Sequence, residues 1–247
     1  MTGLVRKATL LGVCGLIFAG VASASVPDPT KSSVPLFVKV GGKQTTNPAL
    51  ADGSLGFTVT VRDFGNNPIA GANVEVNFQN CTDTRLCSFN LGAQTVDCIN
   101  RAVRATTNAA GQVSFSILGG STNASPPAPP AIAPGSGSGC VRIFAEGIQL
   151  GVATSVLYDQ DGAVPPLGVG ALFRNGVKGS DLPTILSELG SAAAGAPYRG
   201  RSDFSADGAV NGFDLAAFLV VLGSSNAGTG SGNGCSDNTA VAVPYCP

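Results

Sequence analysis

Six residues with regular spacing fall within one twelve-residue stretch, 203–214. At the first, third, fifth, seventh, ninth and twelfth positions stand Asp203, Ser205, Asp207, Ala209, Asn211 and Asp214. All of these offer side-chain oxygens except Ala209, which would offer its backbone carbonyl. Gly208, at the sixth position, permits a sharp turn that would wrap these oxygens around one point. Because Ca²⁺ takes six to eight oxygen ligands from loops with this spacing, the stretch predicts a Ca²⁺ site.

A short helix is expected directly after this loop. Asp214 closes the loop and opens a helix over 215–222, where its negative charge suits the helix dipole, and Gly223 is expected to end it. Val210, at the eighth loop position, is apolar and is expected to point into a small core behind the loop. An Asp- and Gly-rich surface turn is the alternative, but the apolar eighth position and the following helix agree with the ligand spacing.

A degenerate copy of this loop and helix lies 33 residues earlier, since residues 177–190 align with 210–223 without a gap. Both predicted helices carry apolar residues at i, i+3, i+4 and i+7, so they can bury these stripes against each other. The stripes are Leu182, Ile185, Leu186 and Leu189, and Leu215, Phe218, Leu219 and Leu222. In the first loop, 170–181, only Asp181 remains as a ligand, and the charge of Arg174 at another ligand position would repel a cation. We therefore expect one metal site per chain.

Two such repeats resemble a type I dockerin, a module built on calcium loops of the EF-hand type. The resemblance covers residues 168–224, and the second repeat matches the loop of that family at Asp203, Ser205, Asp207, Asn211 and Asp214. It implies a small helical module, placed here over 170–224, that binds Ca²⁺ and docks onto a cohesin module of another exported protein. The loop positions that vary with the partner in dockerins are occupied here by Gly179-Ser180 and Gly212-Phe213. Phe213 is therefore the candidate partner contact, and packing onto the neighbouring repeat is the alternative.

The first half of the chain alternates apolar and polar residues, which is typical of half-buried antiparallel strands. The apolar sets are Leu36, Val38 and Val40; Phe57, Val59 and Val61; Val74, Val76 and Phe78; Val113, Phe115 and Ile117; and Val141, Ile143 and Ala145. Turn residues lie between strands at 63–68 and 107–111. Short strands at this density predict a mainly β fold, with a two-sheet sandwich over 36–160.

The turns of this half resemble those of bacterial immunoglobulin-like domains of the invasin and intimin type. The segments that carry the resemblance are 61–74, VRDFGNNPIAGANV, and 106–115, TTNAAGQVSF. The resemblance covers residues 36–158 and implies an immunoglobulin-like β-sandwich ahead of the dockerin-like module. It implies no single function, since one fold serves many. Two segments depart from the family pattern: a cysteine-containing insertion at 81–98, and a low-complexity loop at 119–139 that is expected to be flexible.

A cleaved export signal is predicted over residues 1–24. Arg6 and Lys7 precede an apolar run, and Ala22-Ser23-Ala24 is typical of a cleavage site. A membrane anchor is the alternative, but the run is short for a span of ~20 residues. A polar leader at 25–35, a linker at 161–169 and a Gly- and Ser-rich tail at 225–247 complete the predicted organisation. We expect a secreted or cell-surface protein with no membrane span after cleavage.

Six of the seven cysteines remain once Cys14 leaves with the predicted signal, and an even number in an exported chain predicts disulfides. The six are Cys81, Cys87, Cys98, Cys140, Cys235 and Cys246. The first four allow three connectivities that the sequence does not distinguish, and a Cys235–Cys246 pair would staple the tail. A zinc site is disfavoured, because the chain has no histidine and no CxxC pair.

Composition argues against catalysis and against nucleic acid as a partner. Without histidine the chain lacks the usual general base and the Ser–His and Cys–His nucleophile pairs. The net charge is −1 with no basic block, which argues against nucleic-acid binding. We expect a non-catalytic protein that docks its β-domain onto another exported protein through the calcium module.

Two further functions stay open at this point. One is a structural or adhesive surface protein in which calcium only stabilises the fold. The other is an accessory protein in polysaccharide degradation, although the chain has no tryptophan and only three tyrosines for sugar stacking. Because metal binding and folding are coupled in small modules, loss of Asp203 or Asp207 is expected to unfold 168–224 and to leave the sandwich intact.

Overall fold

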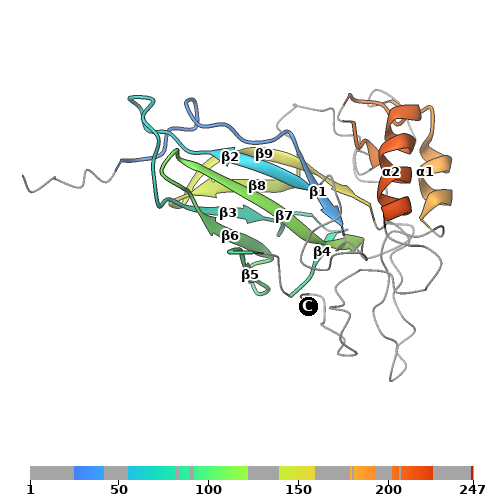
Figure 1. The fold of residues 1–247 in the computed structure, drawn as a ribbon, viewed down its shortest axis with the longest axis horizontal. Helices are drawn as coiled ribbons and strands as arrows, with labels where there is room; N and C mark the ends of the chain where they lie inside the picture. The colour runs from blue at the N-terminus through green and yellow to red at the C-terminus, as the bar shows by residue number, and fades with distance from the viewer. Residues whose placement is uncertain are drawn as a thin grey trace, which may run out of the picture.

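The computed structural model describes residues 25–41, 55–81, 84–88, 92–121, 139–158, 179, 181–192, 202–205, 207–224 and 246. Several predicted segments lie outside these ranges. They are the export signal 1–24, most of the flexible loop 119–139, the linker 161–169, nearly all of the first loop 170–181, and the tail 225–247 except Cys246. The described part contains nine strands and two short helices, so the predicted mainly β class is confirmed (Figure 1).

All nine strands are joined by hydrogen bonds into one mixed sheet. In chain order they are β1 (Phe37–Gly41), β2 (Gly56–Thr60), β3 (Asn73–Asn77), β4 (Thr84–Leu86), β5 (Thr95–Asp97), β6 (Ala102–Thr106), β7 (Gln112–Ser121), β8 (Val141–Ala145) and β9 (Ile148–Leu157). Their order in the sheet is β2-β7-β1-β9-β8-β3-β6-β5, and β4 pairs with β7. The helices that follow are α1 (Leu182–Glu188) and α2 (Gly212–Ser224).

Strand β1 departs from the expected antiparallel pattern. It runs parallel to β7 and also parallel to β9, where Phe37 lies opposite Thr154. Parallel strands are usually covered on both faces, and β1 is an example. Val38 and Val40 lie in the main core, while Phe37 lies in a second apolar cluster on the other face. Alternation in the sequence could not reveal the direction, because parallel and antiparallel strands share the same two-residue period.

Side chains from both halves of the sheet share one main core. Val59 of β2 and Val113 of β7 belong to it, and so do Val74 of β3 and Val103 of β6 from the other end of the strand order. The sheet therefore curves so that its two halves enclose one core (Figure 1). The ladder of strands is continuous through β1, whereas two separate sheets were predicted.

The two turn segments noted in the sequence pack against each other at one end of this core. The Thr107 hydroxyl donates a hydrogen bond of 2.6 Å to the carbonyl of Ile69 and accepts one of 2.9 Å from the amide of Ala72. Gly111 has a φ of 70° and accepts a 2.7 Å hydrogen bond from the amide of Val61. A Cβ at Gly111 would lie 2.6 Å from the Val61 carbonyl oxygen, so this turn requires glycine.

Disulfides tie distant parts of the chain to the sheet. Cys81 bonds to Cys140, and Cys98 bonds to Cys246 across 148 residues of sequence. Cys87 is disulfide-bonded as well. The expected Cys235–Cys246 staple is therefore wrong. Cys246 instead lies buried in the main core, where its amide donates to the carbonyl of Leu86, so the fold brings it to Cys98 although the two are far apart in sequence.

The two helices pack on the sheet through a second apolar cluster, here called the junction cluster. Its sheet-side members are Phe37, Leu55, Cys87, Leu118, Val156 and Tyr158, and its members from the helical region are Ile185, Phe204, Phe218 and Val221. Figure 1 shows α1 and α2 side by side at the end of the sheet, beyond β1 and β4. The helical region and the sheet therefore share buried apolar surface.

The predicted helix stripes are only partly buried. Ile185 and Phe218 are buried as expected, but Leu186, Leu189 and Leu219 remain exposed. Val221, which lies outside the predicted stripe, is buried instead. The reason is that both helices face the sheet as well as each other, which rotates the buried face away from the one that a simple helix pair would use.

Candidate metal centre

Three carboxylates of the loop 203–214 converge on one point. Asp203, Asp207 and Asp214 each place a carboxylate oxygen within 4.8 Å of those of the other two. Asp203 and Asp214 are fully buried, whereas Asp207 is exposed. Like charges at this separation repel each other, and burial removes the water that would screen them. A cation among the three carboxylates would offset both costs.

Asp203 organises the first half of the loop. Its carboxylate accepts hydrogen bonds from the backbone amides of Asp207, at 3.2 Å, and Gly208, at 2.8 Å. Gly208 has a φ of 88°, a left-handed conformation that glycine adopts without the steric penalty of a Cβ. The sharp turn expected at the sixth loop position is therefore present, and it folds the loop back over the Asp203 carboxylate.

Asp214 joins the two halves of the loop. Its two oxygens accept hydrogen bonds of 2.7 Å from the backbone amides of Ser205 and Asn211, one oxygen for each. Asp214 lies in the first turn of α2, where the helix dipole favours a negative charge. The helix itself begins at Gly212 and runs to Ser224, so it is longer at both ends than the predicted 215–222.

The exposed carboxylate of Asp207 is held in place by hydrogen bonds. The hydrogen bond from the Asn211 side-chain amide, followed by that from the backbone amide of Ala209, lowers the pKa of Asp207. These bonds measure 2.8 and 2.9 Å. Asp207 is therefore ionised at neutral pH, and a carboxylate that accepts two hydrogen bonds keeps lone pairs for a cation.

The remaining predicted ligands lie around these carboxylates. The Ser205 hydroxyl is 3.4 Å from an oxygen of Asp203, and the Asn211 side-chain oxygen accepts a 2.8 Å hydrogen bond from the amide of Phe213. Carboxylate, hydroxyl, amide and carbonyl oxygens form a donor set for a hard cation such as Ca²⁺. The residues present therefore fit the ion that the spacing predicts, and Ala209 would contribute its carbonyl.

Backbone hydrogen bonds link this loop to the segment that follows α1. The amide of Gly190 donates to the carbonyl of Val210 at 2.7 Å, and the amide of Val210 donates to the carbonyl of Ser191 at 2.9 Å. Ala192 and Ala209 form an isolated antiparallel bridge beside them. Val210 is fully buried, as predicted. The two repeats are thus joined at the eighth position of the loop.

Asp181, the ligand-type residue of the first repeat, is buried directly before α1. Among the described residues it does not belong to the group of three converging carboxylates. Residues 170–178 and 180 of its loop, including Arg174, lie outside the described residues. The expectation that the first loop holds no metal therefore stays a prediction.

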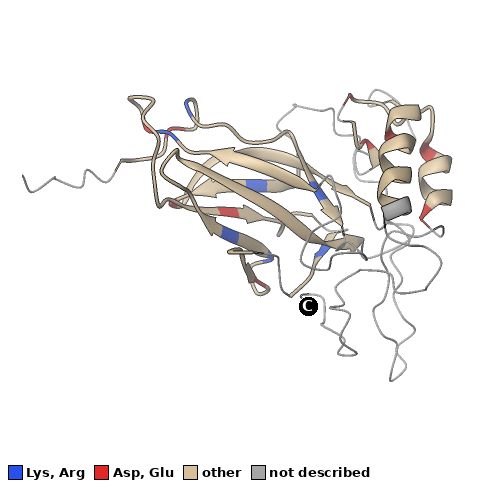
Figure 2. Cartoon of the chain, in the orientation of Figure 1, with Lys and Arg blue, Asp and Glu red and all other residues tan. Residues whose placement is uncertain are grey.

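Phe213 lies at the start of α2, next to the loop, and is 76 % exposed. This exposure disfavours the alternative that Phe213 packs onto the neighbouring repeat, and its role as a partner contact stays a prediction. Val220, on the same helix, is 70 % exposed, and Leu219 is also exposed. Figure 2 shows acidic but no basic residues in the described part of the helical region. The exposed side of α2 is apolar and carries no charged side chain.

Three residues in or near the loop were missed by the sequence analysis. Phe204, at the second loop position, is buried, and its ring stacks on that of Tyr158 at the end of β9. Lys39 of β1 lies near Asp214: burial lowers the pKa of its ammonium group, and the charge of Asp214 partly opposes this. A phenylalanine among polar ligands was a signal that could have been used for Phe204, but no sequence pattern pointed to Tyr158 or Lys39.

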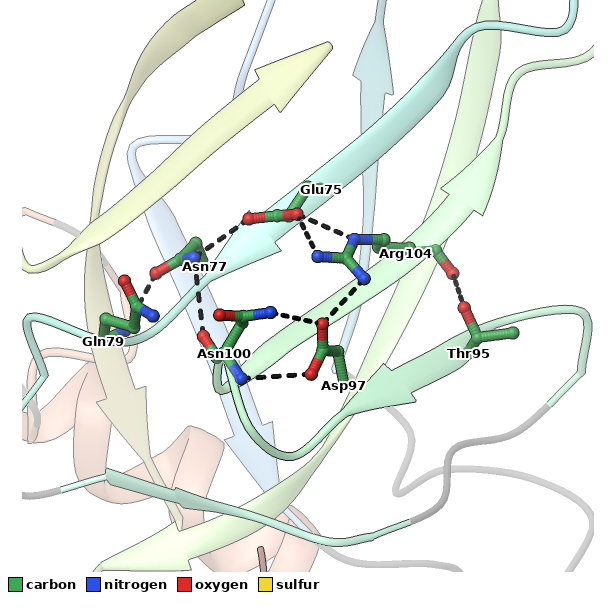
Figure 3. Close-up of polar contacts among 7 residues, drawn as sticks. All are labelled: Glu75, Asn77, Gln79, Thr95, Asp97, Asn100 and Arg104. Atoms are coloured by element: carbon green, nitrogen blue, oxygen red, sulfur yellow. Dashed lines mark hydrogen bonds and ion pairs between the residues drawn. The ribbon is translucent and has the colours of Figure 1, made fainter. Parts of the chain in front are cut away.

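A separate polar network lies on β3, β5 and β6 (Figure 3). Arg104 forms ion pairs with Glu75, at 2.7 Å, and with Asp97, at 2.8 Å. Hydrogen bonds from the side chain and backbone of Asn100, followed by the interaction with Arg104, lower the pKa of Asp97 to about 2. Since both carboxylates are engaged by one arginine, the network joins three strands rather than presenting a pair of carboxylates to a substrate.

Within the described residues, neither helix is long and apolar enough to cross a membrane. No protein-family model, no curated protein and no solved structure matches this chain. The resemblances to dockerins and to immunoglobulin-like domains therefore stay predictions from sequence motifs. What this protein does has to be argued from the geometry of its own site.

Proposed function

We propose that the loop 203–214 binds one Ca²⁺ and that the loaded helical region docks this protein onto another exported protein. The convergence of Asp203, Asp207 and Asp214 within 4.8 Å carries the proposal. Two of these carboxylates are buried, so a cation gains more from them than it would from exposed acids. The disulfides of the described region are consistent with export, because disulfides persist in oxidising compartments.

Calcium suits this loop better than magnesium. Ca²⁺ accepts six to eight oxygens in irregular geometry, whereas Mg²⁺ demands a near-ideal octahedron and keeps several of its waters. A twelve-residue loop that offers carboxylate, hydroxyl, amide and carbonyl oxygens matches the preference of Ca²⁺. Extracellular calcium modules typically bind with Kd values of about 10⁻⁴–10⁻³ M, and we expect this loop to lie in that range.

Calorimetric titration of the oxidised full-length protein tests the metal site. We expect one Ca²⁺ per chain, and much weaker binding of Mg²⁺ under the same conditions. Two strong sites would show that the first loop also binds, and the absence of any site would overturn the proposal. The protein should first be stripped with a chelator, since a resident ion would hide the binding heat.

The apolar face beside the loop supports the docking part of the proposal. Phe213, Leu219 and Val220 are exposed on α2, Leu186 is exposed on α1, and Leu189 is exposed directly after α1. Contiguous exposed apolar surface on a folded protein commonly marks a protein–protein contact. Since no charged side chain lies on the exposed part of α2, the partner is expected to present an uncharged apolar surface.

A capture experiment with exported proteins of the source cells tests docking. The immobilised protein should retain one discrete partner with Ca²⁺ and lose it with chelator. Val220→Asp should also abolish capture, whereas Ile99→Asp, which changes another exposed apolar residue in the turn after β5, should not. Capture that is unaffected by both chelator and Val220→Asp would contradict docking through this face.

A structural role for calcium is the second candidate, and one observation favours it. The loop residue Phe204 is part of the junction cluster, so an ordered loop also stabilises the packing of the helices on the sheet. If this is the whole function, calcium will raise the thermal stability of the protein while no partner is captured in either condition.

A further inference from the structure

We propose that Phe204 positions the calcium loop and that the β-sheet, through Tyr158, sets the affinity of the loop for calcium. This inference rests on the proposed function, because it requires that the loop bind Ca²⁺. It goes beyond a self-contained calcium module: part of the metal affinity would come from a residue at the end of β9, outside the loop 203–214.

The contact between loop and sheet is an aromatic stack. The rings of Phe204 and Tyr158 lie 4.4 Å apart between centroids, with an interplanar angle of 16°. The Phe204 ring also lies 6.2 Å from that of Phe218 in α2. Phe204 is only 2 % exposed and Tyr158 is fully buried, so the stack is closed to solvent. Phe204 thus lies between the sheet on one side and helix α2 on the other.

Phe204 lies between two residues whose positions affect the buried carboxylates of Asp203 and Asp214. Asp203 precedes it, and the Asp203 carboxylate holds the amides of Asp207 and Gly208. Ser205 follows it, and the amide of Ser205 donates to Asp214. A ring fixed between Tyr158 and Phe218 therefore fixes the backbone on both sides, and with it the direction of the Asp203 carboxylate and of the hydrogen bond to Asp214.

Tyr158 is held by the sheet, not by the helical region. Its backbone amide donates a 3.1 Å hydrogen bond to the carbonyl of Val40 in β1. Its ring passes close to Gly41, where an added Cβ would lie 3.5 Å from the Tyr158 Cδ2 and 3.0 Å from a methyl carbon of Leu55. The Tyr158 ring on which Phe204 stacks is thus anchored to β1, an interior strand of the sheet.

Thermodynamic linkage makes the coupling reciprocal. A loop that is already packed against Tyr158 loses less conformational freedom when it binds the ion, so calcium binds more tightly. Calcium binding must in turn strengthen the packing of Phe204 on the sheet by the same factor. This revises the expectation that loss of a ligand leaves the sheet intact: without calcium, the packing of the sheet end around Tyr158 should weaken as well.

Substitutions on the two sides of the stack test the coupling. Phe204→Leu and Tyr158→Leu keep an apolar side chain but remove the stack, and each should weaken calcium binding by about tenfold. Phe57→Leu is the matched control, because Phe57 stacks on Phe115 at 5.5 Å in another part of the sheet. It should lower thermal stability without changing the Kd for calcium. Tyr158→Phe retains the ring and should retain the wild-type Kd.

The double variant Phe204→Leu/Tyr158→Leu gives the sharper result. If the two rings act as one unit, it should bind calcium about as weakly as either single variant, because effects of contacting residues are not additive. A wild-type Kd in Tyr158→Leu, with circular dichroism showing an intact sheet, would overturn the inference and leave the calcium site standing. Failure of the wild-type protein itself to bind calcium would overturn the proposed function and the inference together.

Tyrosine fluorescence supplies a second measurement should a leucine variant fail to fold. The chain has no tryptophan, so its emission comes from three tyrosines. Calcium added to stripped wild-type protein should change this emission, and Tyr158→Phe should remove the change while leaving the Kd unaltered. A calcium response of full wild-type size in Tyr158→Phe would show that the ion does not act on Tyr158.

Discussion

Asp203 and Asp214 are buried in the fold, whereas Asp207 remains in contact with water. The two buried carboxylates are engaged by backbone amides of the loop, so they shape it. Asp207 accepts its hydrogen bonds from Ala209 and from the side chain of Asn211 at the surface. These three acids therefore differ in role: the buried pair shapes the loop, and Asp207 would complete the ligand set of the proposed calcium site.

Asp207, the exposed candidate ligand, is the best residue to substitute in a stability test. A ligand that binds only the folded state at one hundred times its Kd stabilises a protein by about 2.7 kcal/mol. We expect saturating calcium to raise the melting temperature of the wild-type protein, and Asp207→Asn to lose most of this rise. Asp28→Asn, which changes an exposed carboxylate of the N-terminal segment, is the control and should keep the full rise in thermal scans with and without calcium.

Asp97 gives a prediction for the dependence of stability on pH. Its pKa falls from 3.8 to about 2 in the folded protein. The folded state therefore binds fewer protons than the unfolded state between these values, so Asp97 stabilises the fold above pH 3.8 and this contribution is lost as the pH falls towards 2. Urea unfolding should show that Asp97→Asn is less stable than wild type at pH 6, with the difference shrinking as the pH approaches 2. A difference that is constant over this range would contradict the assignment.

At the scale of elements, the turn 107–111 packs closely against Val61, the residue that follows β2. Gly111 and Gly71 both have positive φ values, of 70° and 74°. They differ in surroundings: a Cβ at Gly111 would meet the Val61 carbonyl oxygen at 2.6 Å, whereas a Cβ at Gly71 would meet nothing within 4 Å. Substitution of Gly71 therefore tests the cost of a left-handed backbone alone, whereas substitution of Gly111 tests that cost together with a steric clash.

Alanine at these two positions should have unequal effects. Gly71→Ala should lower the free energy of unfolding by about 1 kcal/mol, because it only forces alanine into a left-handed backbone conformation. Gly111→Ala adds the steric clash and should lower it by roughly 2–4 kcal/mol in total. Denaturant unfolding of both variants measures the difference. Equal losses would show that the turn can move away from Val61, contrary to the close approach seen here.

Helix α2 shows how an element is shaped by what it packs against. Its sequence between Gly212 and Ser224 contains one charged residue, Asp214, which is buried at the candidate metal centre. A helix that is apolar around its whole circumference is normally covered on all sides. The sheet covers one side through Phe218 and Val221, and the opposite side, with Phe213 and Val220, is left exposed.

At the scale of the whole molecule, the bond between Cys98 and Cys246 closes the chain over 148 residues. Cross-linking removes entropy from the unfolded chain, and the loss grows slowly with the size of the closed loop. The sulfurs join the turn after β5 to a residue that is buried in the main core. The end of the sequence is thereby made part of the sheet structure.

Removal of this bond should lower global stability. We expect Cys98→Ser/Cys246→Ser to reduce the free energy of unfolding by about 2–5 kcal/mol. Urea unfolding of oxidised protein provides the measurement, and Cys81→Ser/Cys140→Ser, which opens a loop closed over 59 residues, is the comparison. A loss well below 1 kcal/mol for Cys98→Ser/Cys246→Ser would show that residue 246 stays in place without its disulfide.

The mainly β class, the apolar core positions and the turn glycine of the loop 203–214 could be predicted from the sequence alone. Each depends on local pattern: alternation marks Val59, Val74 and Val113 as inward-facing, and Gly208 is required by a turn of fixed length. The spacing of Asp203, Asp207 and Asp214 likewise brought together residues whose carboxylates do converge. These features are decided within a dozen neighbouring residues, which is the range over which sequence periodicity carries information.

Only the tertiary structure decided which distant segments meet. The parallel direction of β1, the bond from Cys98 to Cys246 and the stack of Phe204 on Tyr158 all join residues far apart in sequence. No local pattern encodes such pairings, because they result from the burial of apolar surface summed over the whole chain. The oxygen spacing of the loop could therefore be read from twelve residues, but its contact with the sheet, through the stack of Phe204 on Tyr158, was visible only in the tertiary structure.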